Sequence, residues 1–521
     1  MDFSVIDIAV FIGYCLLIVA VGLWVSRDKK GHEKDSSDYF LAGSTLPWWA
    51  VGSSLIASNI SAEQFIGMSG SGYALGLGIA TYEWMAAITL LVVGKFFLPI
   101  FLEKKIYTMP QFLEMRYDKR VRTSLAVYWL LVYIFVNLTS VLYLGALTLK
   151  TVMGVDLVTA IVCLAIFSLV YSIYGGLMAV AWTDVVQVVF LVFGGLVTTY
   201  IALNTLSDGA GIFSGLSMLI EKAPERFDMI LDSSHPSYKD LPGISVLIGG
   251  MWIANLNYWG CNQYITQRAL AAKSLSEAQR GIIFAGVLKL IMPMIVVVPG
   301  IVAFVMNPDL PKSDEAYPWL LQTFVPVGLK GLAFAALVAA VVSSLSSMTN
   351  SIATIFSMDL YKEYIKKDVS ESGLVTAGRS VGVVSMIIAI AVAPFLSSLD
   401  QAFQFIQEFT GFVSPGVVAI FLLGFFWKKT TANAALWSAI LSVPVSLLFK
   451  FLLPNLPFLD RMGVIFISLC LLMVGISLYE NKVENPKGIE LSKKLFHTDT
   501  VFNVGAIALC IIIAFLYARF W

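Results

Sequence analysis

The chain has 521 residues, of which 58% are apolar and only 13% are charged, and its mean hydropathy is +0.83. Soluble domains carry about 25% charged residues, so this composition leaves too little polar surface for a globule in water and indicates a membrane protein. Lys and Arg balance Asp and Glu at 34 each, and no long block of one charge occurs, which argues against a nucleic-acid partner.

Apolar segments recur along the whole chain, and a transmembrane helix needs about 20 mostly apolar residues. The first segment continues too long and lacks the preceding basic residues of a cleavable signal peptide, so we expect it to be retained. The sequence predicts an all-α integral membrane protein with 14 transmembrane helices, at 4–26, 47–73, 76–102, 122–149, 154–174, 179–205, 243–267, 280–306, 328–360, 375–396, 400–427, 432–450, 461–480 and 499–520.

The positive charges predict how these helices are oriented, because cytoplasmic connections are enriched in Lys and Arg. If the first connection lies in the cytoplasm, alternate connections hold 23 of the 34 cations. They begin with Arg27, Lys29, Lys30 and Lys34, include Arg268, Lys273 and Arg280 after the seventh span, and end with Lys482, Lys487, Lys493 and Lys494. We therefore expect a multi-pass protein of the cell (inner) membrane with both termini outside the cytoplasm. Two long outer connections, 206–242 and 307–327, are expected to form short capping helices.

Two of the predicted spans are interrupted by glycines and polar side chains. The second contains the run from Ser58 to Gln64, Ser-Asn-Ile-Ser-Ala-Glu-Gln, and the seventh contains the run from Asn255 to Gln263, Asn-Leu-Asn-Tyr-Trp-Gly-Cys-Asn-Gln. Such groups are costly at membrane depth unless they line a cavity or bind a ligand. The alternative is a helix-packing seam of small residues. The clustering of Asn, Gln and Glu beside the glycines favours two broken helices at a binding site.

The spacing of the two broken spans predicts an internal repeat. They are five spans apart, and because five is odd, a five-helix unit repeated in tandem enters the membrane upside down the second time. Paired interrupted helices in corresponding positions indicate an inverted-repeat secondary transporter with its substrate near the midplane. We predict a first repeat at 47–205, an extracellular loop at 206–242 and a second repeat at 243–427. Residues 1–46 form an accessory helix and a cytoplasmic loop, and 428–521 form three accessory helices.

Three motifs resemble the sodium–solute symporter family, and the likeness covers essentially the whole chain. They are Ser58 to Gly67, Tyr174-Gly175-Gly176-Leu177 through Trp182-Thr183-Asp184 to Gln187, and Gly411 through Ser414-Pro415-Gly416 to Trp427-Lys428-Lys429. The resemblance implies a LeuT-like fold and sodium-coupled uptake of a neutral hexose, galactose or glucose, by alternating access. Symport of another solute, such as myo-inositol or sialic acid, is the alternative. The partners implied are the sugar, sodium and the lipid bilayer, with no oligomer required.

A sodium site is expected where free carbonyl groups meet hydroxyl groups, because sodium prefers oxygen ligands. The ninth span contains Ser343-Ser344-Leu345-Ser346-Ser347-Met348-Thr349, and most of these hydroxyls are expected to bond to their own helix. The resemblance selects the side chains of Ser343 and Ser344 and the carbonyls of Ala57, Ile60 and Ala340 as ligands. Asp184 matches an acid that helps sodium leave. The alternative for Asp184 is a helix-end carboxylate in solvent.

A neutral sugar needs convergent donors and acceptors beside an apolar face. Polar side chains within predicted spans supply the candidates Asn59, Gln64, Glu83, Asn255, Lys289 and Gln407. Lys289 is the most informative, because an ammonium at mid-membrane needs acceptors, and Glu83 is able to neutralise it directly or through the sugar. The alternative is a purely structural buried ion pair.

The resemblance also assigns the gates of this site. It places the sugar against Tyr258, the inner gate, with Trp259 beside it, and closes the outer side with Met68 and Phe403. One residue departs from the galactose-carrying member of the family, which has a serine after Tyr-Glu-Trp-Met where this chain has Ala86.

Other classes of function fit the sequence poorly. An enzyme needs a nucleophile–base or metal constellation, and the three histidines are scattered singly in predicted loops. A Walker A motif is absent, so ATP use is not indicated. An alternative function is that of an ion channel, which would conduct sodium without a saturable dependence on sugar. An anionic substrate calls for an unpaired Arg in the core, and the predicted spans provide none.

Overall fold

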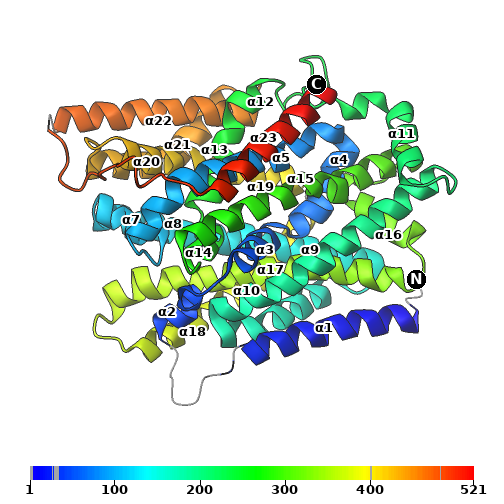
Figure 1. The fold of residues 1–521 in the computed structure, drawn as a ribbon, viewed down its shortest axis with the longest axis horizontal. Helices are drawn as coiled ribbons and strands as arrows, with labels where there is room; N and C mark the ends of the chain where they lie inside the picture. Colours follow the sequence, from blue (N-terminus) through cyan, green and yellow to red (C-terminus); the bar gives the residue numbers. More distant parts are fainter. Residues whose placement is uncertain (1–3, 26, 28–34, 399–401, 481–482) are drawn as a thin grey trace.

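The computed structural model describes residues 4–25, 27, 35–398, 402–480 and 483–521, and within them the chain is helical, with no strand (Figure 1). Lys29, Lys30, Lys34, Lys482 and residues 400–401 of the predicted eleventh span lie outside this part. The N-terminal helices are α1 (Val5–Val25), α2 (Ser36–Leu41), α3 (Trp48–Asn59), α4 (Ser69–Leu75), α5 (Thr81–Val92), α6 (Leu98–Glu103), α7 (Met109–Arg116), α8 (Lys119–Val132), α9 (Thr139–Met153) and α10 (Leu157–Leu206).

The second half of the chain continues in the same way. Its helices are α11 (Ile212–Lys222), α12 (Ser245–Ile248), α13 (Gly250–Leu256), α14 (Gln263–Leu270), α15 (Leu275–Met306), α16 (Ala316–Phe324), α17 (Leu329–Ile355), α18 (Glu371–Val392), α19 (Ala402–Gly411), α20 (Ser414–Phe426), α21 (Ala432–Leu452), α22 (Phe458–Glu480) and α23 (Thr500–Arg519). The short helices expected in the outer connections are present as α11 and α16.

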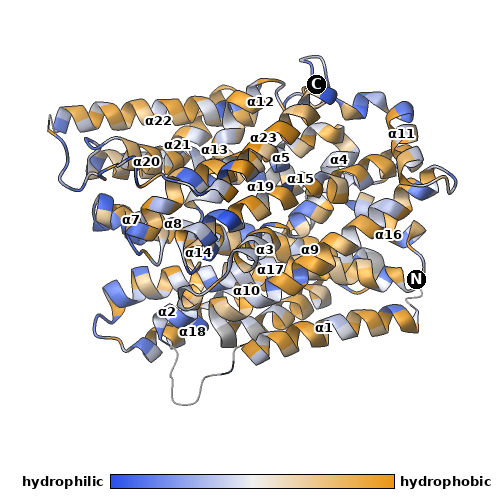
Figure 2. Ribbon diagram, viewed as in Figure 1, coloured by the Kyte–Doolittle hydropathy of each residue, from blue (hydrophilic) through white to orange (hydrophobic). Residues whose placement is uncertain are grey.

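Ten helical segments among the described residues are long and apolar enough to cross a membrane, and Leu157–Val170 and Ser414–Phe426 are shorter apolar helices. The prediction of 14 spans therefore stays a prediction. Of the apolar window in Leu329–Ile365, which includes α17, 94% is buried, against 17% for α1. α17 is thus a central helix and α1 a peripheral one. Figure 2 shows hydrophobic residues along α1 and α22, and hydrophilic residues gathered in the connections.

Both predicted helix interruptions are present. α3 ends at Asn59, Ile60 is extended (φ −77°, ψ 102°), and the chain resumes as a π-helical segment, η2 (Glu63–Met68), that leads into α4. In the second case, α13 continues into the π-helical segment η7 (Asn257–Cys261), Asn262 is extended (φ −87°, ψ 124°), and α14 follows. Each break frees backbone groups from helical hydrogen bonding in the interior of the molecule.

α10 joins the predicted spans 154–174 and 179–205 at a sharp change of direction. Gly176 has φ +61° and ψ −154°, a backbone conformation that side chains with a Cβ rarely adopt. A Cβ at this position would also collide with the Tyr39 carbonyl oxygen. The glycine therefore permits both the bend and the close approach of α2.

Candidate functional site

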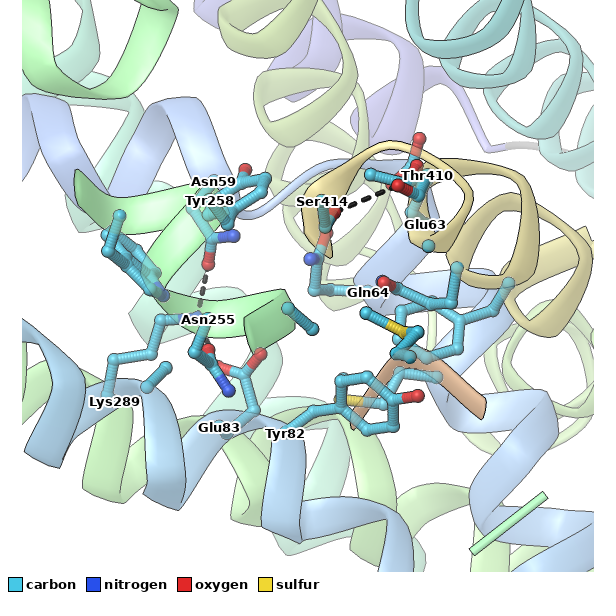
Figure 3. A pocket seen from close by; sticks show the side chains of 18 residues that line it. Asn59, Glu63, Gln64, Tyr82, Glu83, Asn255, Tyr258, Lys289, Thr410 and Ser414 are labelled. Atoms are coloured by element: carbon cyan, nitrogen blue, oxygen red, sulfur yellow. Dashed lines mark hydrogen bonds and ion pairs between the residues drawn. The ribbon is translucent and has the colours of Figure 1, made fainter. Parts of the chain in front are cut away.

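A cavity of about 60 Å³ lies between the two broken helices (Figure 3). It has room for about four water molecules. Every residue that the sequence analysis assigned to the sugar or its gates lines this one cavity. Its lining residues are Asn59, Glu63, Gln64, Met68, Tyr82, Glu83, Ala86, Ala254, Asn255, Tyr258, Trp259, Lys289, Phe403, Gln407, Thr410, Gly411, Ser414 and Met462.

Lys289 is the electrostatic centre of one end of the cavity. It is only 1% exposed, and its Nζ donates to Glu83 Oε2 at 2.5 Å and to Asn59 Oδ1. The ammonium also lies 5.0 Å from the centre of the Trp259 ring, within the range of a cation–π interaction. α15, α5, α3 and η7 thus converge on one charge, and of the two ways in which Glu83 could neutralise Lys289, the structure shows the direct one. The paired charges and the amide oxygen explain how a lysine is tolerated in the interior.

Two amide side chains in the cavity each use one of their polar atoms in hydrogen bonds to nearby residues of the same segment. Gln64 Oε1 accepts from the Ser61 backbone N–H at 2.9 Å and from Ser61 Oγ at 3.0 Å, which stabilises the restart of the chain after the first break. Asn255 Nδ2 donates to the Met251 carbonyl at 3.1 Å. The Gln64 amide donor and the Asn255 carbonyl acceptor are the groups that these bonds leave for a ligand.

Aromatic residues line the side of the cavity near the second break. The Tyr264 hydroxyl donates to the Tyr258 hydroxyl at 2.8 Å, and the Tyr258 and Trp259 rings meet edge to face at 5.2 Å. The Tyr133 hydroxyl donates to Asn262 Oδ1, at the extended residue itself. Tyr258 is therefore held by a hydroxyl network that continues into α14.

On the opposite side, Met68 and Phe403 are both buried. The Tyr82 and Phe403 rings pack edge to face at 5.3 Å. A Cβ on Gly67 would lie 2.8 Å from Phe403 Cβ, so glycine is needed for η2 and α19 to approach this closely. Met68, Tyr82 and Phe403 together cover this side of the cavity.

Four polar lining residues were not assigned from the sequence, namely Glu63, Tyr82, Thr410 and Ser414. Glu63 stands in the first interrupted run, directly before Gln64, and a second acid within a predicted span was a signal that could have identified it. Thr410 and Ser414 carry only hydroxyls in an apolar segment. Because hydroxyls in helices usually bond to their own backbone, as Ser414 does to the Thr410 carbonyl at 2.8 Å, no sequence signal singled them out.

The predicted sodium ligands gather where α17 meets the end of α3. Ser344 Oγ donates to the Ser58 carbonyl at 3.1 Å, and Ser343 Oγ donates to Asp184 Oδ1 at 2.6 Å. The three residues predicted to contribute carbonyls, Ala57, Ile60 and Ala340, are fully buried. Thr349, further along α17, donates to the Leu345 carbonyl of its own helix at 2.7 Å, as expected for most of this run.

Asp184 is not a helix-end carboxylate in solvent, and that alternative is wrong. It is fully buried, and besides Ser343 it accepts from Ser54 Oγ at 2.5 Å and from Ser58 Oγ at 3.4 Å. α10, α3 and α17 are therefore joined by one carboxylate next to the first helix break. This arrangement places the Asp184 carboxylate beside the predicted sodium ligands.

Arg268 was placed in a cytoplasmic connection by the charge pattern, and the structure corrects this. It lies in α14, fully buried, and donates to Ser54 Oγ at 3.3 Å, to Ser347 Oγ and to the Tyr264 carbonyl. Ser54 links it to Asp184, so the acid and the guanidinium compensate each other in one hydroxyl network. A position one residue beyond a predicted span end could not be assigned from hydropathy, because helix ends are uncertain by several residues.

Removing the Arg268 charge is expected to destabilise the protein. Replacing one partner of a buried charged network leaves the other uncompensated and costs about 3 kcal/mol. We expect Arg268→Met to lower the melting temperature in detergent, measured by intrinsic fluorescence. Arg280→Met is the matched control, because Arg280 pairs with Asp499 at the surface and such pairs contribute about 0–1 kcal/mol. Equal shifts for both variants would contradict this account of Arg268.

With this geometry in place, comparison with known proteins identifies the family. The profile of the sodium:solute symporter family matches residues 39–442. The chain belongs to the sodium:solute symporter family. It is therefore a transporter, as predicted, and not an enzyme. The symporter is 56% identical to the sodium/glucose cotransporter of Vibrio parahaemolyticus over 99% of this chain and 98% of that protein. It is 36% identical to the human sodium/myo-inositol cotransporter 2 over 83% of this chain and 68% of that protein.

Solved structures agree with this assignment. The symporter superposes on a substrate-bound, outward-open Na⁺-coupled sialic acid symporter with a TM-score of 0.80 and 27% identity, covering 92% of this chain and 98% of the other. The closed conformation of the nucleobase–cation symporter Mhp1 gives a TM-score of 0.56 at 13% identity, which is a likeness of fold alone.

Proposed function

We propose that this symporter couples inward sodium flow to the uptake of a neutral hexose, galactose or glucose. The observation that carries the proposal is the charge of the cavity. Among the described residues that line it, Lys289 is the one cation, and Glu83 and Asn59 already bind its ammonium group. A substrate carboxylate would therefore find no unpaired cation here, whereas hydroxyl groups can pair with the carboxylates, the amides and the ammonium. The 56% identity to a sodium/glucose cotransporter supports the same substrate class.

Within this proposal, the lining residues divide into polar contacts and gates. Asn59, Gln64, Glu83, Asn255, Lys289 and Gln407 hydrogen-bond to the sugar, and Tyr258 and Trp259 cover its apolar face. Tyr258 is the inner gate, and Met68 and Phe403 close the outer side. Sodium binds the carbonyls of Ala57, Ile60 and Ala340 and the hydroxyls of Ser343 and Ser344, and leaves past Asp184.

We further propose 14 spans across the cell (inner) membrane, with both termini outside the cytoplasm, and two inverted repeats at 47–205 and 243–427. The matching helix breaks at Ile60 and Asn262 support this arrangement, because each falls in the first helix of its repeat. Residues 1–46 and 428–521 are accessory, and 206–242 is the outer loop between the repeats.

Transport in this scheme proceeds by alternating access. Sodium bound between α17 and the end of α3 stabilises the outward-open state, which admits the sugar. Each ligand must bind one state better than the other, and the coupling is reciprocal. Each charge that crosses 100 mV contributes about 2.3 kcal/mol to accumulation.

The proposal is tested by uptake into proteoliposomes with and without an inward sodium gradient, using radiolabelled galactose, glucose, myo-inositol and sialic acid. We expect sodium-dependent accumulation of galactose or glucose. Myo-inositol is the second candidate, because a 36% identical relative is a sodium/myo-inositol cotransporter. Accumulation of sialic acid alone would overturn the argument from cavity charge, and sodium current without saturable solute uptake would indicate a channel.

Ala86 provides a test of which hexose is preferred. It lines the cavity one helical turn after Glu83 on α5, so a hydroxyl introduced there is within reach of the same ligand. A new neutral hydrogen bond contributes about 0.5–1.5 kcal/mol. We expect Ala86→Ser to change the galactose-to-glucose ratio of kcat/KM by about 2- to 10-fold. Ala87→Ser, buried on the same helix but absent from the cavity lining, is the control that should leave the ratio unchanged.

A further inference from the structure

A second polar cavity, of about 40 Å³, adjoins the first. Glu63, Tyr258, Gln407 and Thr410 line both cavities, so the two are separated by little more than these side chains. Figure 3 shows Glu63 with Thr410 and Ser414 at the end of the first cavity that lies away from Lys289. The remaining lining residues are Tyr128, Trp129, Val132, Tyr133, Asn137, Asn257, Asn262, Ile406, Val413 and Val417.

Glu63 is a buried acid without a compensating charge in the described part of the chain. It is 9% exposed, and its carboxylate accepts one long hydrogen bond, from Ser140 Oγ at 3.4 Å. That hydroxyl is shared, because it also donates to the Val136 carbonyl. The ammonium of Lys289, towards the other end of the first cavity (Figure 3), is bound to Glu83 and Asn59. An uncompensated carboxylate in the interior costs several kcal/mol, so a ligand that neutralises it is favoured.

Asn257 supplies an independent sign that a ligand belongs here. It is 8% exposed, and its Oδ1 has no hydrogen-bond partner although the atom is buried. Leaving such an acceptor unpaired in the interior is unfavourable. Its neighbour Asn262 differs, since the Tyr133 hydroxyl satisfies that Oδ1. The second cavity therefore presents a carboxylate and an open amide oxygen, and no described cation.

We infer that Glu63 and Asn257, with the Thr410 hydroxyl, bind a second sodium ion. Carboxylate, amide carbonyl and hydroxyl oxygens are the ligands that hard cations prefer, and one ion satisfies both the charge of Glu63 and the open acceptor of Asn257. The inference rests on sodium being the coupling ion of the proposed function, and it gives two sodium ions per sugar. Because Glu63 lines the first cavity as well, an ion bound to Glu63 raises the affinity of that cavity for the sugar.

The test is equilibrium binding of ²²Na⁺ to the purified symporter in detergent, without any substrate, so a wrong hexose assignment cannot affect it. We expect two sodium ions per wild-type chain and one in Glu63→Gln. Ser343→Ala should keep two sites, one of them about 10- to 100-fold weaker, and the double variant should keep only the weakened site. Glu221→Gln, an exposed carboxylate in the outer loop, is the control and should retain two. In uptake assays, the Hill coefficient for sodium should fall from near two to one in Glu63→Gln.

The inference of a second site would be contradicted if the wild-type chain bound only one sodium ion, or if Glu63→Gln still bound two. If sugar uptake carries protons into the vesicles, and Glu63→Gln abolishes that proton flow while sodium binding stays at one, the site holds a proton and not sodium. Should Glu63→Gln fail to fold, judged by gel filtration, Asn257→Leu decides the matter. It leaves the carboxylate in place, and we expect it to weaken one of the two sodium sites at least 10-fold.

Discussion

Replacement of Lys289 by methionine is expected to abolish sodium-driven hexose accumulation, with a loss of at least about 100-fold in kcat/KM. The ammonium is bound between Glu83 and Asn59 and is 1% exposed, so its removal leaves a buried carboxylate uncompensated. Breaking a buried ion pair costs about 3–5 kcal/mol, and 1.4 kcal/mol corresponds to a factor of ten. Uptake of radiolabelled galactose and glucose into proteoliposomes measures the effect.

The controls for Lys289→Met separate binding from folding. Lys95→Met removes a partly exposed lysine in a predicted span, outside the cavity lining, and should leave uptake within about 2-fold of wild type. The double variant Glu83→Gln, Lys289→Met removes both charges and should recover thermal stability without recovering uptake. If the double variant recovers uptake as well, the pair is structural and the sugar binds elsewhere.

Replacement of Ser343 by alanine is expected to raise the half-saturating sodium concentration about 10- to 100-fold. The hydroxyl donates to Asp184 at 2.6 Å in a fully buried network, and it is one of two side-chain oxygens proposed to bind sodium. Hydrogen bonds to charged groups contribute about 1.5–3 kcal/mol, which gives this range. The measurement is sodium-dependent uptake at fixed sugar concentration.

Thr349→Val is the matched control for Ser343→Ala, because both positions are buried on α17. The Thr349 hydroxyl donates to the Leu345 carbonyl of its own helix and is assigned no ligand role. We expect its sodium dependence to match wild type. An unchanged sodium dependence in Ser343→Ala would place the coupling ion outside the region where α17 meets α3.

The membrane class, the two helix breaks and many of the polar residues that line the cavity were predictable from the sequence. Hydropathy indicates the class because lipid has to be the solvent of such an apolar chain, and the breaks stand out because Asn, Gln and Glu are rare within spans. Lys289 was identified for the same reason, and Glu83 was its one acidic candidate partner. The sodium ligands and gates came from the resemblance to the family, since single hydroxyls and aromatics in a helix carry too little information alone.

Only the tertiary structure decided how the interior charges are shared. Lys289 pairs with Glu83 directly, Asp184 is buried among serines of α3 and α17, and Arg268 belongs to that network rather than to a loop. These choices depend on which side chains from distant helices come within hydrogen-bond distance. Hydropathy reports the average cost of placing a residue in the membrane, and it contains no information on the partner that compensates that cost.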